Sequence, residues 1–531
     1  MYNELGVWFC KDCMPYLLYY VDRMNKLLQT FLFVALAFEE LLIRGIPVLK
    51  RTFPLDNVEA VVFTLSQNVQ RSRDFAISLF LQALRDSVLW SAGIIVAVLV
   101  VWAVFKKLCQ SQRFQLFGKL RLSLRKLLVF ACVALFVILA KTVYNDVPVI
   151  RYYLVWKNAV DIPEHSSFYQ IEYVNPDSVQ IIFHEKRNLI LIFLESMEYN
   201  FQDSSSGGNL KENLIPEITG YLNNEQSFVP GGVSVSGMGW TMADVVAKTC
   251  GIPLFFPPSM RARFTPLESF LPGVTCLTDI LIGNGYKFVV SKGANLKFSG
   301  MDDFLNTHSS PEAYGLMYYL RDERVKEDST TNWGVKDSLH YELVKEHVSR
   351  ISKEDKPWAM WMFTVDTHTP YGYLDPKCAP DSGISQDHQM PYVIRCASRQ
   401  VDKFIKWAKK QDWFANTTIA VMGDHEMMAA PEIVGFRDDA IKHYWLNFFI
   451  NSVKMNDQRE RAFTSLDFFP TILESIGAEI PNGSLGFGHS LYLNAPTLLE
   501  KYGKDSLDNV LKKKICRIRL FPLFQKEVGT V

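Results

Sequence analysis

The sequence lacks an excess of either charge, because its 56 lysines and arginines are matched by 56 aspartates and glutamates over 531 residues. A chain without a basic field gives no reason to expect a nucleic-acid partner. It also lacks internal repeats and low-complexity segments, which argues against a solenoid. The first 26 residues hold no apolar h-region, so we expect no cleaved signal peptide.

Long apolar runs are confined to the first 150 residues. Residues 88–105 are uncharged, and residues 127–144 contain only Lys141 as a charged residue. Both runs predict membrane-spanning helices. Residues 27–49 are the third predicted span, in which Glu39, Glu40 and Arg44 would each cost about 2.5 to 3.5 kcal/mol at a helix centre. An interfacial amphipathic helix is the alternative for this third run.

The loop between the two uncharged runs predicts the topology. It carries basic residues and no acidic ones, namely Lys106, Lys107, Arg113, Lys119, Arg121, Arg125 and Lys126. The positive-inside rule places such a loop in the cytoplasm. We therefore expect an N-terminal helical membrane domain over residues 1–150, a linker over 151–185 and an extracytoplasmic domain over 186–495.

This outer domain alternates apolar strand-like runs with helical patterns, which indicates an α/β fold with a sheet flanked by helices. Three of the runs, residues 188–194, 358–365 and 417–422, end in candidate functional side chains. Glu195 follows the first run, His368 the second, and Asp424 and His425 the third. Since open α/β sheets place their sites beyond the carboxyl ends of the strands, we expect these side chains to meet.

Thr241 is the candidate nucleophile. It follows Gly237 and Gly239, and the apolar run after it, residues 242–250, predicts a helix that stops at Gly251. A phosphate attacked by this hydroxyl would lie at the positive end of that helix. A plain N-cap is the alternative for an isolated threonine at such a position.

The four residues Glu195, Thr241, Asp424 and His425 together suit one divalent cation. Carboxylate, hydroxyl and imidazole ligands fit manganese, zinc or magnesium better than calcium. Such an ion would lower the pKa of the threonine hydroxyl, which permits attack on a phosphate and a covalent phospho-threonine. His368 is then expected to hydrogen-bond a phosphoryl oxygen or to protonate the leaving alcohol.

Candidate substrate-binding residues lie in two further segments. The polar loop of residues 292–303 contains Asn295 and Asp302. Trp333 comes just before a helix expected to run towards Ile351. We predict that these three residues contact substrate together with His368.

Several of these motifs resemble the alkaline phosphatase and sulfatase superfamily. The resemblance is closest to the membrane-anchored lipoteichoic acid synthase group, and within it to the phosphoglycerol transferases that modify periplasmic glucans. It rests on Leu194-Glu195-Ser196, Gly239-Trp240-Thr241 with Val246-Ala247 and Cys250-Gly-Ile-Pro-Leu-Phe255, Gly293-Ala-Asn-Leu296 with Phe298, Thr364-Val-Asp-Thr-His368, and Asp424-His425.

This resemblance implies an enzyme of the inner membrane of a bacterium, multi-pass, with its catalytic domain on the periplasmic face. It implies metal binding by Glu195, Thr241, Asp424 and His425, with manganese as the first choice. The implied reaction moves phosphoglycerol from phosphatidylglycerol to a glycan of the periplasm or cell envelope. Ser299 and Met301 stand where lipoteichoic acid synthases have a tryptophan and an arginine, so we do not expect polymerisation of glycerol phosphate.

Three other functions are compared with this one. A sulfatase activity needs a cysteine or serine in a C/S-x-P-x-R motif, and Cys250-Gly-Ile-Pro253 has the wrong spacing and no arginine. A phosphoethanolamine transferase would use the same threonine and metal. A catalytically silent membrane-anchored scaffold is the alternative from a different class, and it would have no physical need to keep the metal ligands together.

Four cysteines of the outer domain can pair in three ways. The short-loop choice joins Cys250 to Cys276 and Cys378 to Cys396, as an oxidising compartment would permit. Residues 496–531 form a basic C-terminal tail with interleaved apolar residues. This tail is either a solvated helix face or a contact with anionic lipid.

Overall fold

The computed structural model describes residues 168–224, 227–228, 232–254, 269–369, 371–428, 430–436, 444–454 and 460–512, and the short stretches 38–39, 43 and 133–142. The chain divides into two compact units, and the larger one contains residues 160–531. In the smaller unit, residues 133–142 are helical and lie inside the run predicted as the last span. Within the described stretches, no helix has both the length and the apolar composition of a membrane span. The predicted spans 27–49 and 88–105 fall almost wholly outside the described residues, and all three spans stay predictions.

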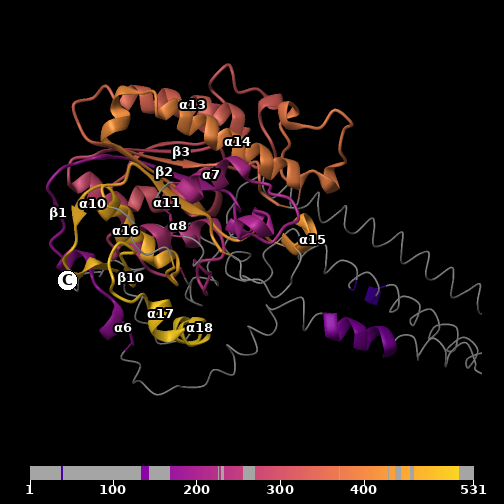
Figure 1. The fold of residues 1–531 in the computed structure, drawn as a ribbon, viewed down its shortest axis with the longest axis horizontal. Helices are drawn as coiled ribbons and strands as arrows, with labels where there is room; N and C mark the ends of the chain where they lie inside the picture. Colours follow the sequence, from indigo (N-terminus) through magenta and orange to yellow (C-terminus); the bar gives the residue numbers. More distant parts are fainter. Residues whose placement is uncertain are drawn as a thin grey trace, which may run out of the picture. The chain divides into compact units, whose positions relative to one another are not determined.

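A six-stranded sheet in the order β4-β3-β5-β2-β6-β7 forms the centre of the larger unit (Figure 1). All neighbouring strands pair in parallel except β7, which runs antiparallel to β6. The strands are β2 (Asn188–Leu194), β3 (Lys287–Lys292), β4 (Glu312–Tyr314), β5 (Trp358–Phe363), β6 (Thr417–Gly423) and β7 (Asn447–Ile450). The predicted α/β sheet and the strand runs at 188–194, 358–365 and 417–422 are thereby confirmed.

Helices cover both faces of the sheet, which is why β2 is buried along its whole length and apolar from Leu189 to Leu194. Leu189, Leu191 and Phe193 pack on one face, and the intervening Ile190 and Ile192 pack on the other. The first face is covered by α8 (Thr241–Cys250), α10 (Leu277–Gly283), α11 (Met301–Thr307) and α16 (Phe468–Ser475). The second is covered by α7 (Pro216–Asn224), α13 (Asp337–Ile351) and α14 (Met390–Ala408).

The chain on either side of the sheet domain packs against the same core. Phe168 of α6 (Phe168–Glu172) is buried, and β1 (Ile182–Phe183) pairs with β8 (Ala478–Glu479). At the other end, α17 (Leu498–Tyr502) and α18 (Lys504–Lys512) bury Leu498, Leu499, Leu507 and Leu511. Packing therefore includes the second half of the predicted linker and continues past residue 495, while residues 513–531 of the predicted tail lie outside the described residues.

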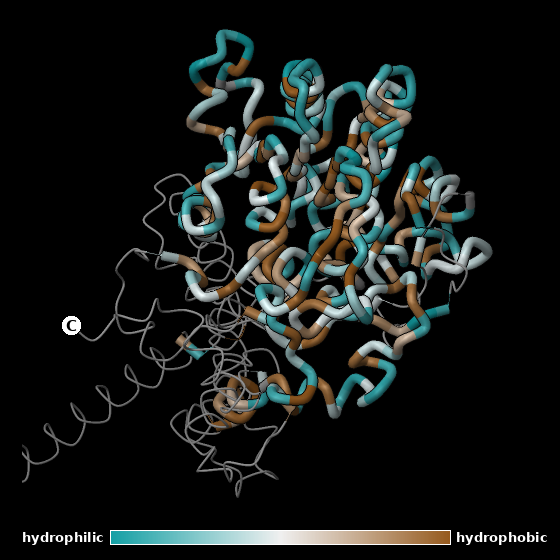
Figure 2. Tube along the Cα trace, turned by 90° about the vertical axis from the view of Figure 1, so that its left-hand side faces the viewer, coloured by the Kyte–Doolittle hydropathy of each residue, from teal (hydrophilic) through white to brown (hydrophobic). Residues whose placement is uncertain are grey.

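The remaining described elements are short. They are α12 (Leu316–Tyr319), α15 (Ala430–Val434), β9 (Ser484–Leu485) and β10 (Gly488–His489). Figure 2 shows the resulting distribution of hydropathy, with hydrophobic segments through the middle of the domain and hydrophilic turns around it. This is the pattern of a sheet buried between two helical layers.

Both predicted disulfides are present. Cys250, the last residue of α8, is bonded to Cys276, which caps α10. Cys378 is bonded to Cys396 on α14. The first bond fixes the end of the helix that begins at Thr241.

Candidate active site

The parallel pairing of β2 with β6 brings three predicted ligands together. Leu194 lies opposite Gly423 in the register, and the backbone N–H of Asp424 donates to the carbonyl of Leu194 over 3.0 Å. Glu195, Asp424 and His425 consequently leave the same edge of the sheet. Their potential ligand atoms all lie within 4.8 Å of one another, and all three residues are buried.

The charges of this cluster favour a bound cation. The Nε2 atom of His425 lies 3.5 Å from one oxygen of Glu195 and 3.5 Å from one oxygen of Asp424. Burial alone would lower the pKa of His425, but the two carboxylates raise it to about 9. Burial and the nearby Glu195 raise the pKa of Asp424. The positive charge of protonated His425 partly balances the negative charges of Glu195 and Asp424. A divalent ion would supply this positive charge in place of the proton.

The donor set fits such an ion. The Nδ1 atom of His425 lies 2.8 Å from the carbonyl of Glu426, so this nitrogen carries the proton. The Nε2 lone pair of the neutral ring then faces the two carboxylates, as a metal-binding histidine requires. Two hard oxygens and one imidazole nitrogen suit manganese, zinc or magnesium.

Ser196 holds both carboxylates in place. Its backbone N–H donates to Asp424 over 2.7 Å, and its hydroxyl donates to Glu195 over 2.7 Å. Ser196 adopts a φ of 53°, in the left-handed region that costs a residue with a side chain about 1 to 3 kcal/mol. The strained turn after β2 thus aims two donors of one residue at the two carboxylates.

Thr241 is the first residue of α8, as predicted, and it lines the same pocket as Glu195 and Asp424. The other nine residues of α8 are buried, whereas Thr241 is partly exposed. The first intrahelical hydrogen bond runs from the N–H of Asp244 to the carbonyl of Trp240. The N–H groups of the first turn therefore have no intrahelical partner, and the helix dipole favours an anion there.

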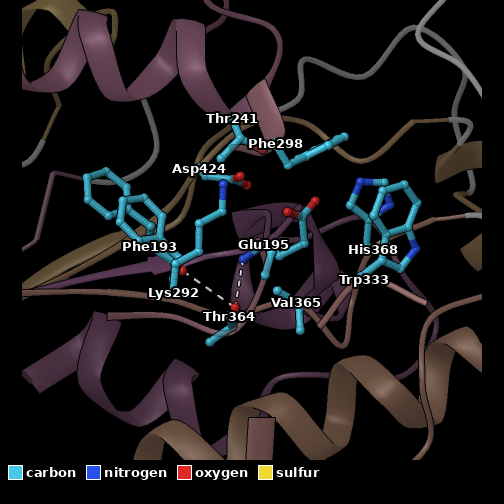
Figure 3. Close-up of a pocket in the computed structure, with 12 residues that line it drawn as sticks. Phe193, Glu195, Thr241, Lys292, Phe298, Trp333, Thr364, Val365, His368 and Asp424 are labelled. Carbon is cyan, nitrogen blue, oxygen red and sulfur yellow. Dashed lines mark hydrogen bonds between the residues drawn. The ribbon is translucent and has the colours of Figure 1, made fainter. Parts of the chain in front are cut away.

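The pocket has a volume of about 380 Å³, part of which opens to solvent. Its other lining residues are Phe193, Lys292, Ala294, Phe298, Trp333, Phe363, Thr364, Val365 and His368. Figure 3 shows the Lys292 side chain reaching from the end of β3 towards Asp424 and Thr241.

Lys292 is the site residue that the sequence did not single out. It is only 4% exposed, and no hydrogen bond or salt bridge to its Nζ atom is found among the described residues. Burial lowers the pKa of Lys292 to about 8, against the opposing effect of Glu195, Asp424 and Asp302. A buried cation without a hydrogen-bonded partner, aimed into a pocket, is suited to binding an anionic group.

His368 and Trp333 form the opposite wall of the pocket (Figure 3). Their rings stack with centroids 3.5 Å apart, and Phe298 meets the edge of Trp333 at 5.9 Å. The Nδ1 atom of His368 donates to the carbonyl of Thr369 over 2.8 Å. Burial disfavours the charged ring and lowers the pKa of His368 to about 4, so the ring is neutral at pH 7 and its Nε2 lone pair is available to accept a hydrogen bond.

Asn295 and Asp302 lie near this pocket but not among the residues that line it. The side-chain oxygen of Asn295 accepts from the backbone N–H of Lys297 over 3.0 Å. Asp302 belongs to the first turn of α11, and its charge acts on Lys292. The geometry thus gathers Glu195, Thr241, His368, Asp424, His425 and Trp333, while Asn295 and Asp302 remain predicted substrate contacts.

Comparison with known proteins gives one family and a set of curated relatives. Residues 187–478 match the family model described as Sulfatase. The chain is 32% identical over 257 residues to "Phosphoglycerol transferase I" of Salmonella agona (strain SL483), which covers 48% of this chain and 32% of the relative. It is 32% identical over 248 residues to the protein of the same name from Salmonella arizonae, a match that covers 46% of this chain and 31% of the relative. The chain therefore spans about a third of the length of these relatives.

Two solved structures are similar to parts of this chain. A protein of the alkaline phosphatase superfamily from Vibrio parahaemolyticus has 19% identity and a TM-score of 0.47, covering 64% of this chain and 78% of its own. A lipoteichoic acid synthase from Listeria monocytogenes has 16% identity and a TM-score of 0.45, and the match covers 59% of this chain and 79% of the synthase chain. The family match and the curated relatives confirm the resemblance that the motifs predicted.

Proposed function

The chain belongs to the sulfatase family, since the family model covers more than half of its residues, and we propose that it transfers phosphoglycerol. The donor is phosphatidylglycerol, the acceptor is a hydroxyl of a periplasmic or cell-envelope glycan, and Thr241 carries the group between them. The shared name of the curated relatives supports the choice of phosphoglycerol.

One observation carries this proposal. Thr241, at the N-terminus of α8, shares a pocket with Glu195 and Asp424, two members of the buried acidic cluster completed by His425. A hydroxyl, a cluster that favours a cation and a helix N-terminus are the three features that attack on a phosphodiester needs. Trp240, rather than Thr241, is the N-cap of α8, so a capping role does not account for the threonine.

Glu195, Asp424 and His425 would hold one divalent ion, with Thr241 as the fourth ligand. We propose manganese, with zinc or magnesium as alternatives. The ion would lower the pKa of the threonine hydroxyl and reduce the negative charge that an incoming phosphodiester meets.

The transfer has two halves with Thr241 in both. In the first, the Thr241 hydroxyl gives up its proton to solvent and its oxygen forms a bond to phosphorus. The bond from phosphorus to the diacylglycerol oxygen breaks, and diacylglycerol departs as an alcohol after gaining a proton. In the second, the acceptor hydroxyl attacks the same phosphorus, and the threonine oxygen is released. The acceptor loses its proton in this half.

His368 is the residue we assign to the two proton transfers. The pKa of about 4 holds for the protein alone, and an anionic donor beside the ring would raise it. His368 would then protonate the leaving diacylglycerol oxygen and later accept the proton of the acceptor hydroxyl. Lys292 would bind a phosphoryl oxygen, and Trp333, Asn295 and Asp302 would contact the glycerol or the acceptor.

The location follows from the sequence. We propose a multi-pass protein of the bacterial inner membrane, with predicted spans at 27–49, 88–105 and 127–144 and the catalytic domain on the periplasmic face. The two disulfides are consistent with an oxidising compartment. An anchored enzyme meets a membrane-bound donor at a high effective concentration, which favours a lipid headgroup over a soluble donor.

The test places the whole chain in membrane vesicles with Mn²⁺ and adds each lipid separately. Diacylglycerol release is then measured for each lipid. We expect release from phosphatidylglycerol and a labelled headgroup on Thr241. Release from phosphatidylethanolamine alone would favour the phosphoethanolamine transferase instead. No release from either lipid, with the metal bound, would leave the silent scaffold as the better description.

A further inference from the structure

A fully buried ion pair lies behind the nucleophile. Asp244 and Lys248 follow Thr241 by three and seven residues, so all three side chains lie along one face of α8. Asp244 and Lys248 are each 0% exposed, and the Lys248 ammonium donates to the Asp244 carboxylate. Lys248 also lies over the ring of Trp445, 4.4 Å from its centroid.

The ammonium group of Lys248 reaches beyond its own helix. Its Nζ atom donates to the carbonyl of Gly423 over 2.9 Å and to the carbonyl of Asp424 over 3.1 Å. These are the two carbonyls at the exit of β6, and the second belongs to the peptide that joins Asp424 to His425. With Asp244, they occupy all three N–H groups of the ammonium.

The pair is itself held from outside the helix. The hydroxyl of Ser465 donates to the Asp244 carboxylate from the 3-10 turn Ser465–Asp467. Asp244 is therefore fixed between Lys248 and Ser465, and Lys248 is fixed between Asp244 and the end of β6. The result is a continuous set of contacts from the nucleophile helix to the backbone of two predicted metal ligands.

We infer that Asp244 and Lys248 are positioning residues, which hold the Asp424–His425 backbone in register with Thr241 so that the ligands and the nucleophile share one cation. This inference rests on the proposed function for the role of Thr241. Stability alone gives little reason for such a pair, because apolar side chains of similar size in its place are often neutral or stabilising. An apolar side chain cannot bond to the carbonyls of Gly423 and Asp424.

The test compares the full-length protein with three variants of α8. Lys248→Met removes the bonds to both carbonyls. Asp244→Asn keeps the size of the side chain and removes its charge, so Lys248 retains the carbonyls. Val246→Ala is the matched control, because Val246 is equally buried on the same helix but has no contact of this kind. Titration calorimetry measures the Mn²⁺ affinity of each protein, and thermal unfolding measures the stability of each protein.

We expect Lys248→Met to weaken Mn²⁺ binding by about 10 to 100-fold, the range usual for residues that orient metal ligands. Asp244→Asn should weaken it less, and Val246→Ala should leave it within about twofold of the wild type while lowering the unfolding temperature. In diacylglycerol release, the fall for Lys248→Met should be in kcat rather than in KM.

Equal Mn²⁺ affinities in Lys248→Met and Val246→Ala would overturn the inference. If Lys248→Met does not fold, the inference is tested by Asp244→Asn instead. A Mn²⁺ affinity of Asp244→Asn equal to that of the wild type would also overturn the inference. Mn²⁺ binding needs no lipid, so the order of Mn²⁺ affinities among the variants tests this inference independently of the transfer reaction. If the wild type released diacylglycerol from neither lipid, that result would refute the proposed function but not this inference.

Discussion

The indole ring of Trp333 lies almost parallel to the imidazole of His368, with the ring centroids 3.5 Å apart and an angle of 19° between the planes. This stack and the bond from Nδ1 to the Thr369 carbonyl fix the ring so that Nε2 faces the pocket. We predict that His368→Ala lowers kcat by about 100-fold, the usual effect of losing a positioned acid or base. Metal analysis should show an unchanged content, and a stoichiometric loss of metal would instead make His368 a ligand.

The stack itself can be tested separately from the imidazole. Trp333→Ala keeps His368 but removes the ring that orients it, and an aromatic pair is worth about 0.5 to 1.5 kcal/mol beyond its buried area. We predict a fall in kcat/KM of about 3 to 10-fold, with Trp333→Phe much closer to the wild type. A Phe variant as impaired as the Ala variant would show that the indole N–H, rather than the stack, matters.

Thr241→Ala should abolish transfer, because it removes the atom that forms the bond to phosphorus. The proposed ligands Glu195, Asp424 and His425 remain, so we expect Mn²⁺ affinity to fall by no more than about tenfold. Thr241→Ser keeps the hydroxyl and should keep measurable turnover. Mass spectrometry of the tryptic peptide after incubation with donor alone checks the covalent adduct, and an adduct in Thr241→Ala would disprove the assignment.

Lys292→Met should lower kcat/KM by about 100-fold or more, since a buried cation beside the reacting phosphate is lost. Lys292→Arg restores the charge with a different shape and should recover part of this loss. The control is Lys297→Met, an exposed lysine of the same loop. Equal kinetics for Lys292→Met and Lys297→Met would remove Lys292 from the site.

The sequence predicted the sheet and most of the site because both depend on short-range patterns. A buried parallel strand must be apolar along its length, so the runs at 188–194 and 417–422 were recognisable, and the residues that follow them had to share an edge. The helix at 242–250 could be read from its apolar residues and from Gly251, which has a φ of 68°.

The parts that were missed depend on packing. Lys292 follows an apolar run just as a surface lysine would, and only the fold shows that it points into the pocket. Asp244 and Lys248 have the spacing of an exposed i, i+4 pair, but both are fully buried, and the Lys248 ammonium lies over the rings of Trp445 and Phe468. Asn295 and Asp302 stay predicted substrate contacts, and the side-chain oxygen of Asn295 accepts from the backbone N–H of Lys297.

Removal of the metal should affect stability as well as activity. Mn²⁺ at about 100 times its Kd would stabilise the folded state by about 2.7 kcal/mol. We predict that chelation lowers the unfolding temperature of the wild type and that Mn²⁺ restores it. Asp424→Asn should be inactive and show no such response, because Asp424 is both a proposed ligand and the acceptor of the Ser196 N–H. A full Mn²⁺ response in Asp424→Asn would contradict the proposed ligand set.

The last prediction concerns Asp279, which lies beside the disulfide that ends α8. Its carboxylate accepts from the backbone N–H of Cys276 at 2.9 Å, from the Nδ1 of His308 at 2.8 Å and from the hydroxyl of Ser309 at 2.7 Å. Burial alone would raise the pKa of Asp279, but these donors outweigh it and lower the pKa below its usual 3.8. The carboxylate therefore stabilises the fold fully above pH 3.8, and this contribution is lost as the pH falls through the lower folded pKa.

Asp279→Asn should accordingly lower the free energy of unfolding by about 1 to 2 kcal/mol at pH 7, the scale of hydrogen bonds to a charged group. The difference from the wild type should shrink as the pH falls below 3.8, because the wild type then loses the same charge. Asp505→Asn, an exposed acid in the first turn of α18, serves as the control and should change stability by less than about 0.5 kcal/mol. Denaturant unfolding at several pH values measures all three proteins, and a difference that stayed constant down to pH 3 would show that the Asp279 contacts do not depend on its charge.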